Sequence, residues 1–310
     1  MKPNPERLIW LDGSLIKAMD ARVSVLSPTA QFGLNVFEGI RGYWSDTFND
    51  IVIFRFQDHI DRLRESCRLI GVSCPFSDDE LFRGVQEVLN ANEFNHDVAL
   101  RLTVFVGGMQ GSWHSCEPVS AFIAPIEKPR RDLTTMRGLS ATVSSWRRIS
   151  DNVLPPRSKV GANYLNGRYA QLDANDAGYD LPIMLNDSGK VGESAGSCVM
   201  IVRENEIITP PVTASILESI TRASLLELAE TLGLKTCVRE MDRTEVCLAD
   251  EVFLCGSAAE ILPITKVDRF MIGSGNAGPI SKKLHSEYIK LVSGELETFH
   301  SYLRPVRNEK

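Results

Sequence analysis

The sequence lacks any run of about 18 apolar residues, the length that suggests a membrane-spanning helix. Its first stretch, MKPNPERLIWLDG, carries charge and proline where a secretion signal would need an apolar core. It also lacks an excess of positive charge, because the net charge is −6 and the densest basic cluster, KPRRD at 128–132, is short. We therefore expect a cytoplasmic protein that binds neither membranes nor nucleic acid.

Disulfide and metal-binding patterns are missing as well. The seven cysteines are scattered with no pair at CxxC spacing, and the five histidines form no HExxH or His/Cys cluster. We therefore expect reduced thiols and no metal site. The pattern GxxxxGK[ST] is also absent, so a nucleotide-binding protein ranks far below an enzyme as an interpretation.

What is present predicts two domains, since a single core stops growing near a length of 310 residues. Strands and helices alternate in residues 1–126, which we predict to be a small α/β domain. The polar, basic stretch EKPRRDLTTMRG at 127–138 predicts an interdomain linker, and 139–310 a large cofactor-binding domain. The alternation is not strictly βαβ, which favours a mixed α/β (α+β) enzyme-like fold.

The periodicity of apolar residues predicts the individual elements. Amphipathic spacing and capping residues predict helices at 56–72, 77–93, 163–178, 220–233 and 280–299. Short apolar runs rich in β-branched residues predict strands at 7–13, 51–56, 98–108, 120–126, 139–146, 180–187, 198–205, 235–241 and 251–256.

Four stretches carry residue types that suit an anionic cofactor. Thr221 opens a helix, where N–H groups and a hydroxyl can bind phosphate. Ser257 lies in the small-residue turn LCGSAAE, Arg62 lies on a predicted helix, and Glu193 lies in the glycine- and serine-rich SGKVGESAGS. Each of these alone also fits an ordinary cap, turn or exposed side chain. Their occurrence together, in this order, is the stronger signal.

Seven collinear blocks make the chain resemble one family over nearly its whole length. It is similar to the branched-chain amino acid aminotransferases, which are pyridoxal-phosphate enzymes of fold type IV. The matching blocks are FGLNVFEGIRGY (32–43), HIDRLRES (59–66), VSSWRR (143–148), SKVGANYL (158–165), GESAGS (192–197), TPPVTASILESITR (209–222) and LADEVFLCGSAAEILPI (248–264).

The resemblance implies a two-domain enzyme that uses pyridoxal 5′-phosphate. Lys159 occupies the position of the family's Schiff-base lysine and is the expected catalytic residue. Tyr164 matches the phenol that contacts the cofactor's ring oxygen, and Glu193 the carboxylate that faces the pyridine nitrogen. The positions that match the phosphate-binding residues are Arg62, Ile220, Thr221 and Ser257.

The resemblance also implies residues for the substrate. Phe37 and Trp146 match positions that line the side-chain pocket, although either could be a plain core aromatic. The backbone amides of Ser257 and Ala258 would take the α-carboxylate. Arg101 aligns with an arginine that can bind the distal carboxylate of glutamate. The implied reaction is transfer of an amino group from an apolar L-amino acid to a 2-oxo acid such as 2-oxoglutarate, by a homodimer or higher homo-oligomer.

Several positions depart from the family pattern and leave the substrate open. Gln31 and Phe32 replace a His-Tyr pair, and Ala99 replaces a tyrosine. Further differences lie at Gly196–Cys198, at Ser219 and at Ser257. Because the catalytic set is intact while the pocket has changed, a bulkier or specialised amino acid is an alternative donor. The sequence also leaves open a fold-type IV lyase, a D-amino acid or amine transaminase, and a silent homologue that only binds.

Overall fold

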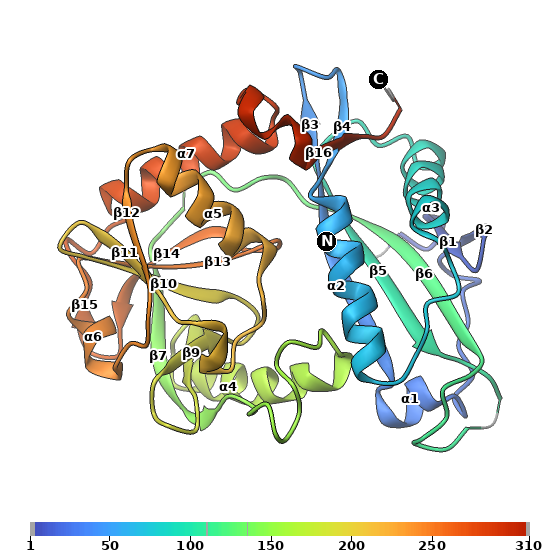
Figure 1. The fold of residues 1–310 in the computed structure, drawn as a ribbon, viewed down its shortest axis with the longest axis horizontal. Coiled ribbons are helices and arrows are strands. Elements are labelled where there is room, and N and C mark those ends of the chain that lie inside the picture. Colours follow the sequence, from blue (N-terminus) through green and yellow to red (C-terminus); the bar gives the residue numbers. More distant parts are fainter. Residues whose placement is uncertain (1–3, 110, 135, 308–310) are drawn as a thin grey trace. The chain divides into compact units, whose positions relative to one another are not determined.

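The computed structural model describes residues 4–109, 111–134 and 136–307, which form two compact units (Figure 1). The first unit runs to Arg130 and also takes in residues 158–162 and the chain from Lys290 onward. The second unit holds residues 131–157 and 163–289. The predicted large domain, 139–310, includes residues 158–162 and the C-terminal segment. The predicted mixed α/β class is confirmed.

The first unit is built on a seven-stranded sheet with the order β16-β4-β3-β5-β6-β1-β2. Two longer helices, α2 and α3, lie against it (Figure 1). Its elements are β1 (Leu8–Leu11), β2 (Ser14–Lys17), α1 (Pro28–Phe32), β3 (Asn35–Ser45), β4 (Asp50–Phe54), α2 (Phe56–Leu69), α3 (Asp78–Ala91), β5 (Val98–Val106), β6 (Val119–Glu127), the 3₁₀ helix η3 (Glu297–Tyr302) and β16 (Leu303–Pro305).

The core of this unit lies between the sheet and these two helices. Ile60 and Leu63 from α2 and Leu81 and Val85 from α3 are fully buried together with Ile40 of β3. Because successive strand residues point to opposite faces, the even-numbered residues of β3 face the helices. Its odd-numbered residues therefore lie on the other face of the sheet.

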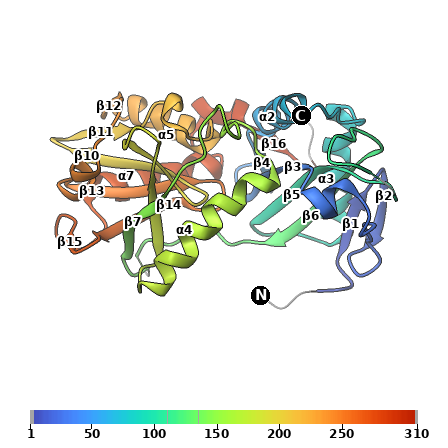
Figure 2. The same cartoon turned by 90° about the horizontal axis from the view of Figure 1, so that it is seen from below.

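The second unit is built on a nine-stranded sheet with the order β12-β11-β10-β13-β14-β7-β8-β9, to which β15 adds beside β14. Helix α4 lies along β7 and β8, and α5 along β12 and β13 (Figure 2). Its elements are β7 (Leu139–Arg147), α4 (Tyr164–Asp176), β8 (Leu181–Leu185), β9 (Val191–Ser194), β10 (Cys198–Arg203), β11 (Glu206–Thr209), η2 (Val212–Ala214), α5 (Ile220–Thr231), β12 (Lys235–Val238), α6 (Arg243–Cys247), β13 (Glu251–Gly256), β14 (Glu260–Val267) and β15 (Phe270–Met271). The residues of η1 (Gly161–Asn163) and α7 (Pro279–Val292) are divided between the two units.

Two differences from the predicted elements have clear physical causes. The predicted C-terminal helix 280–299 is wrong beyond Val292, because Gly294 adopts a φ of 78° and the chain then forms the separate helix η3. The 11-residue strand β3 was not predicted. Its sequence, NVFEGIRGYWS, mixes buried charges and glycines with apolar residues, so it shows no clean alternation.

None of the described helices is long and apolar enough to span a membrane. All seven cysteines are free thiols in the structure.

Residues 158–162 join the first unit by filling an open edge of β3. Strand β3 pairs with β5 from Asn35 to Gly42, but with β4 only from Gly42 onward. Along the unpaired part, the Phe37 N–H donates to the Lys159 carbonyl at 3.1 Å, and a β-bridge joins Val36 to Val160. An isolated β-bridge therefore holds the segment that carries Lys159 to β3.

The glycine at 161 makes this close approach possible. A Cβ at this position would lie 2.4 Å from Oδ1 of Asn35, whose amide nitrogen is itself bonded to Thr29 at 3.2 Å. We therefore expect Gly161→Ala to lower the free energy of unfolding by about 1–3 kcal/mol through overpacking. Gly39→Ala is the matched control, because its Cβ would meet no heavy atom within 4 Å.

Urea denaturation followed by tryptophan fluorescence measures both variants. Equal stability of Gly161→Ala and the wild type would show that the segment is not held tightly against β3.

Candidate active site

Lys159 is held at its backbone from two sides. Besides its carbonyl bond to β3, its N–H donates to the Ser66 hydroxyl of α2 at 3.0 Å, and the Ser158 hydroxyl donates to the Ser66 carbonyl at 3.4 Å. The residue is half-buried. A fixed main chain with a partly exposed side chain is what a lysine that reacts with a ligand requires.

The lysine amine lies beside an aromatic ring of β3. Its Nζ is 5.3 Å from the ring centroid of Phe37, and the Arg101 guanidinium is 4.1 Å from the same centroid. In the register of β3 and β5, Arg101 lies opposite Gly39. A Cβ added to Gly39 would meet no heavy atom within 4 Å, so there is open space beside this glycine. The structure thus brings three predicted residues together around an aromatic ring: Lys159, Phe37 and Arg101.

Arg62 comes from α2 and is buried against the helix-facing side of β3. Its Nε and Nη2 donate to the two carboxylate oxygens of Glu38 at 2.8 and 2.7 Å. The His59 Nδ1 lies 2.7 Å from Oε2 of the same carboxylate. One face of α2 therefore carries His59, Arg62 and Ser66, at spacings of three and four residues.

The pKa shifts of Glu38 and His59 indicate that His59 is present as the neutral ring and that Glu38 carries a negative charge. Burial alone would raise the pKa of the Glu38 carboxyl, but the Arg62 charge and the His59 hydrogen bond outweigh it and hold the pKa well below its usual range. Burial lowers the pKa of His59, and the Arg62 and Lys159 charges act in the same direction against the raising effect of Glu38. His59 is thus neutral at pH 7 while Glu38 is ionised.

In the second unit, Glu193 lies at the end of the sheet on β9 and is buried. Its Oε1 forms an ion pair with Nη2 of Arg148 at 2.5 Å, and its Oε2 accepts the Leu217 N–H at 3.3 Å. Both partners of the ion pair have side chains that are 7% exposed. A carboxylate has about four lone-pair sites for hydrogen bonds, so Glu193 suits a ligand nitrogen that carries a proton.

Arg148 also ties together the segments around this carboxylate. Its Nε donates to the Ser215 carbonyl and its Nη1 to Oδ1 of Asn166, each at 3.3 Å. Asn166 is in the first turn of α4, two residues after Tyr164, and Ser215 lies five residues before α5. One guanidinium thus connects β9, α4 and the approach to α5.

Close packing of small residues places Tyr164 near two turns of the second unit. A Cβ on Gly196 would lie 3.8 Å from Cε1 of Tyr164, and one on Gly256 would lie 3.8 Å from the Gly196 carbonyl oxygen. Half-buried Ser257 and exposed Ala258 follow Gly256 in the turn between β13 and β14.

The start of α5 offers donors for an anion. The Ser219 hydroxyl caps the helix by accepting the Arg222 N–H at 3.2 Å. The N–H groups of Ile220 and Thr221, in the first turn, have no acceptor within the helix itself. Together with the helix dipole and the buried Thr221 hydroxyl, they suit a phosphate.

Trp146 is placed differently from the other predicted residues. Its side chain is 42% exposed and stacks on Tyr169 of α4 with 4.9 Å between ring centroids. Its Nε1 donates to Asp173, also of α4, at 2.8 Å.

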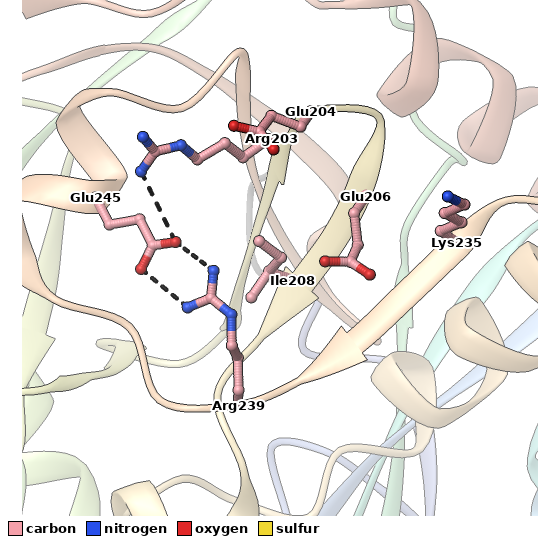
Figure 3. Close-up of a pocket in the computed structure, with 7 residues that line it drawn as sticks. All are labelled: Arg203, Glu204, Glu206, Ile208, Lys235, Arg239 and Glu245. Carbon is pink, nitrogen blue, oxygen red and sulfur yellow. Dashed lines mark hydrogen bonds and ion pairs between the residues drawn. The ribbon is translucent and has the colours of Figure 1, made fainter.

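Two other features of the second unit are poor candidates for a ligand site. A hollow of about 400 Å³ beside β11 and β12 is lined mainly by charged residues, among which Glu245 is bonded to Arg239 and lies 4.0 Å from Arg203 (Figure 3). The glycine-rich stretch 273–278 precedes α7, but the Glu251 carboxylate already accepts the N–H groups of Ile280 and Ser281 at 2.8 Å each. That helix start is therefore occupied by a protein carboxylate.

The supporting residues Glu38, His59, Ser66 and Arg148 were not predicted. The blocks FGLNVFEGIRGY, HIDRLRES and VSSWRR contain all four, but their partners lie 21 to 93 residues away. Only the spacing of His59, Arg62 and Ser66 on one helix face was a usable signal in the sequence.

Comparison with known proteins agrees with this arrangement. The family model for amino-transferase class IV matches residues 35–267. A probable branched-chain-amino-acid aminotransferase of Aquifex aeolicus is 33% identical over 298 residues, which is 96% of each chain. The chain is a member of the branched-chain aminotransferase family within the class IV aminotransferases. It is therefore a transaminase, and the predicted family and enzyme class are confirmed.

Solved structures of this family match the fold closely. A branched-chain aminotransferase from Thermoproteus uzoniensis, solved with norvaline, superposes with a TM-score of 0.90 at 37% identity, covering 96% of this chain and 99% of the other. The branched-chain amino acid aminotransferase from Thermobaculum terrenum, solved in its PLP-form, has a TM-score of 0.91 at 38% identity, covering 98% and 99%.

Substitution of Arg148 tests directly whether the buried Glu193 depends on this ion pair. Arg148→Gln leaves a buried carboxylate without its partner, so we expect the free energy of unfolding to fall by about 3–5 kcal/mol. Arg147→Gln is the matched control, since this exposed neighbour makes one bond to the Asn186 carbonyl at 3.1 Å. Its expected cost is about 1 kcal/mol.

Chemical denaturation of the cofactor-free protein distinguishes the two variants. A loss of the same size for both would mean that Glu193 does not depend on Arg148.

Proposed function

We propose that this transaminase binds pyridoxal 5′-phosphate through Lys159 and transfers the amino group of an apolar, branched-chain type L-amino acid to a 2-oxo acid such as 2-oxoglutarate. The observation that carries the proposal is Lys159 itself, with its main chain fixed by β3 and Ser66 and its amine beside the Phe37 ring. The norvaline bound to the Thermoproteus relative supports an apolar donor.

The residues present fit this cofactor chemically. Ionised, Arg148-paired Glu193 suits a protonated pyridine nitrogen, and Tyr164 can bond to the ring oxygen. The phosphate would be bound by Arg62, Ile220, Thr221 and Ser257, which combine a guanidinium, a helix start and hydroxyls. Bound pyridoxal phosphate would supply an aldehyde that takes up the amino group and a ring that withdraws electrons from the substrate Cα.

The remaining tasks fall to side chains of the protein. Lys159 Nζ would take the proton from the donor's Cα, which is a general-base role. The Phe37 ring would pack on the apolar side chain of the donor, and the amides of Ser257 and Ala258 would bind its α-carboxylate. Arg101, held over Phe37, would pair with the distal carboxylate of a dicarboxylic acceptor.

For Trp146, a place in the substrate pocket stays a prediction from sequence. Its stacking on Tyr169 and its bond to Asp173 give that role no support.

A Lys159-dependent absorbance band is the test of this function. We expect purified protein loaded with pyridoxal phosphate to show a visible band that branched-chain L-amino acids bleach. Lys159→Ala should lose the band, because it removes the amine that links to the cofactor. Lys283→Ala, an exposed lysine on α7, should keep it.

Each alternative activity gives a different result in this assay. Bleaching by D-alanine alone would identify a D-amino acid transaminase, and pyruvate release without amino transfer would identify a lyase. A band that survives in Lys159→Ala would overturn the assignment of the lysine.

We further propose that the enzyme works in the cytoplasm as a homodimer or higher homo-oligomer. The seven free thiols suit a reducing compartment. Three large apolar side chains of the first unit, Val25, Met109 and Trp113, are 80%, 76% and 72% exposed. Apolar exposure of this kind is typical of a surface that another copy covers.

Sedimentation velocity tests the assembly. We expect twice the mass of the chain or more, with Trp113→Ser shifted toward the monomer and Met271→Ser, an exposed residue of the second unit, unchanged. A monomeric wild type at micromolar concentration would contradict this proposal.

A further inference from the structure

Glu38 is a fully buried carboxylate for which the proposed reaction has no direct task. It lies on β3 and points to α2, away from the face that carries Phe37. Both of its oxygens are bonded to the Arg62 guanidinium, at 2.8 and 2.7 Å, and one is also bonded to His59 at 2.7 Å. A buried carboxylate with this many partners is held in one position.

The buried pair of Glu38 and Arg62 is better explained by the orientation it gives the guanidinium than by the stability it gives the fold. Burying two opposite charges removes both from water, so such a pair often adds little more stability than apolar residues of the same size would. What it does provide is a fixed plane, because a carboxylate that binds two N–H groups of a guanidinium sets its direction as well as its position.

The two hydrogen bonds between Glu38 and Arg62 use one edge of the guanidinium. Glu38 takes the side edge, formed by Nε and Nη2. A guanidinium carries five N–H donors, and these two bonds use one on Nε and one on Nη2. Together they fix the plane of the guanidinium.

The same helix face links Arg62 to the reactive lysine. Ser66 follows Arg62 by four residues on α2, and its hydroxyl accepts the Lys159 N–H at 3.0 Å. His59 precedes Arg62 by three residues and bonds to Glu38 as the neutral imidazole. One face of α2 therefore holds both the Arg62 guanidinium and the Lys159 main chain. The residues involved are Glu38, His59, Arg62 and Ser66.

We propose that Glu38 is a positioning residue that holds the Arg62 guanidinium at a set place relative to Lys159, so that Arg62 binds the phosphate of the cofactor while Lys159 binds its aldehyde. This inference rests on the proposed function. It assigns Glu38 to recognition of the phosphate group alone.

Comparison of pyridoxal phosphate with pyridoxal, which has no phosphate, isolates this role. Affinities of the cofactor-free protein are measured for both by absorbance or fluorescence titration. We expect Glu38→Gln to weaken pyridoxal phosphate binding by about 10- to 100-fold, the usual effect of removing an outer partner of a binding residue. Pyridoxal binding should stay within about twofold. Arg62→Gln should show the same selective loss, and the double variant no further loss, because both act through one contact.

Asp97 offers a matched control in the same unit. Its carboxylate binds Nε and Nη2 of Arg130 at 2.7 Å each, the same kind of fork, but neither residue has a role in the proposed cofactor site. Asp97→Asn should lower the melting temperature and leave the ratio of the two affinities unchanged. If Glu38→Gln does not fold, Glu38→Asp retracts the carboxylate by one methylene and should shift the ratio in the same direction.

Different outcomes would overturn the positioning role of Glu38 and the proposed binding of pyridoxal phosphate through Lys159. Equal weakening of both ligands by the Glu38 variants, or no weakening at all, would overturn the positioning role. A wild type that binds pyridoxal phosphate no better than pyridoxal, with no Lys159-dependent band, would overturn the proposed function itself.

Discussion

The hydrogen bonds that hold residues 158–160 to β3 and α2 are the constraint on which the proposed site depends. Through them, a segment from the middle of the chain becomes part of the first unit, and the Lys159 amine lies 5.3 Å from the centre of the Phe37 ring. The glycine at 161 follows from this contact, because a Cβ at 161 would collide with Asn35. The lysine that we propose as the reactive residue is thus positioned by its main chain.

Each unit then fixes a functional side chain with a buried pair of arginine and carboxylate. In the first unit the carboxylate of Glu38 binds the Arg62 guanidinium through both oxygens, and in the second the guanidinium of Arg148 forms an ion pair with Glu193. The roles are reversed, since the outer partner is an anion in one unit and a cation in the other. In both, a charge that we propose to bind the ligand is held by an opposite charge that the ligand does not need to touch.

The sequence predicted the mixed α/β class, because β-branched runs and amphipathic helices such as 220–233 are local signals. It did not predict β3, whose Glu38, Gly39 and Arg41 break the alternation, since their environment is set by α2 and β5. The family motifs pointed to Lys159 and Glu193, whereas Arg148 emerged only from the fold, 45 residues from its partner. Long-range pairings of this kind leave no mark on periodicity or composition.

The measurement that most directly tests this account is chemical mapping of the cofactor-bound lysine. Protein loaded with pyridoxal phosphate is reduced with borohydride, digested, and analysed by mass spectrometry. The account predicts a single peptide with a pyridoxyl group, spanning residues 158–162 and modified at Lys159. Modification at another lysine, or none above the level of unloaded protein, would contradict the claim that the segment beside β3 presents the reactive amine.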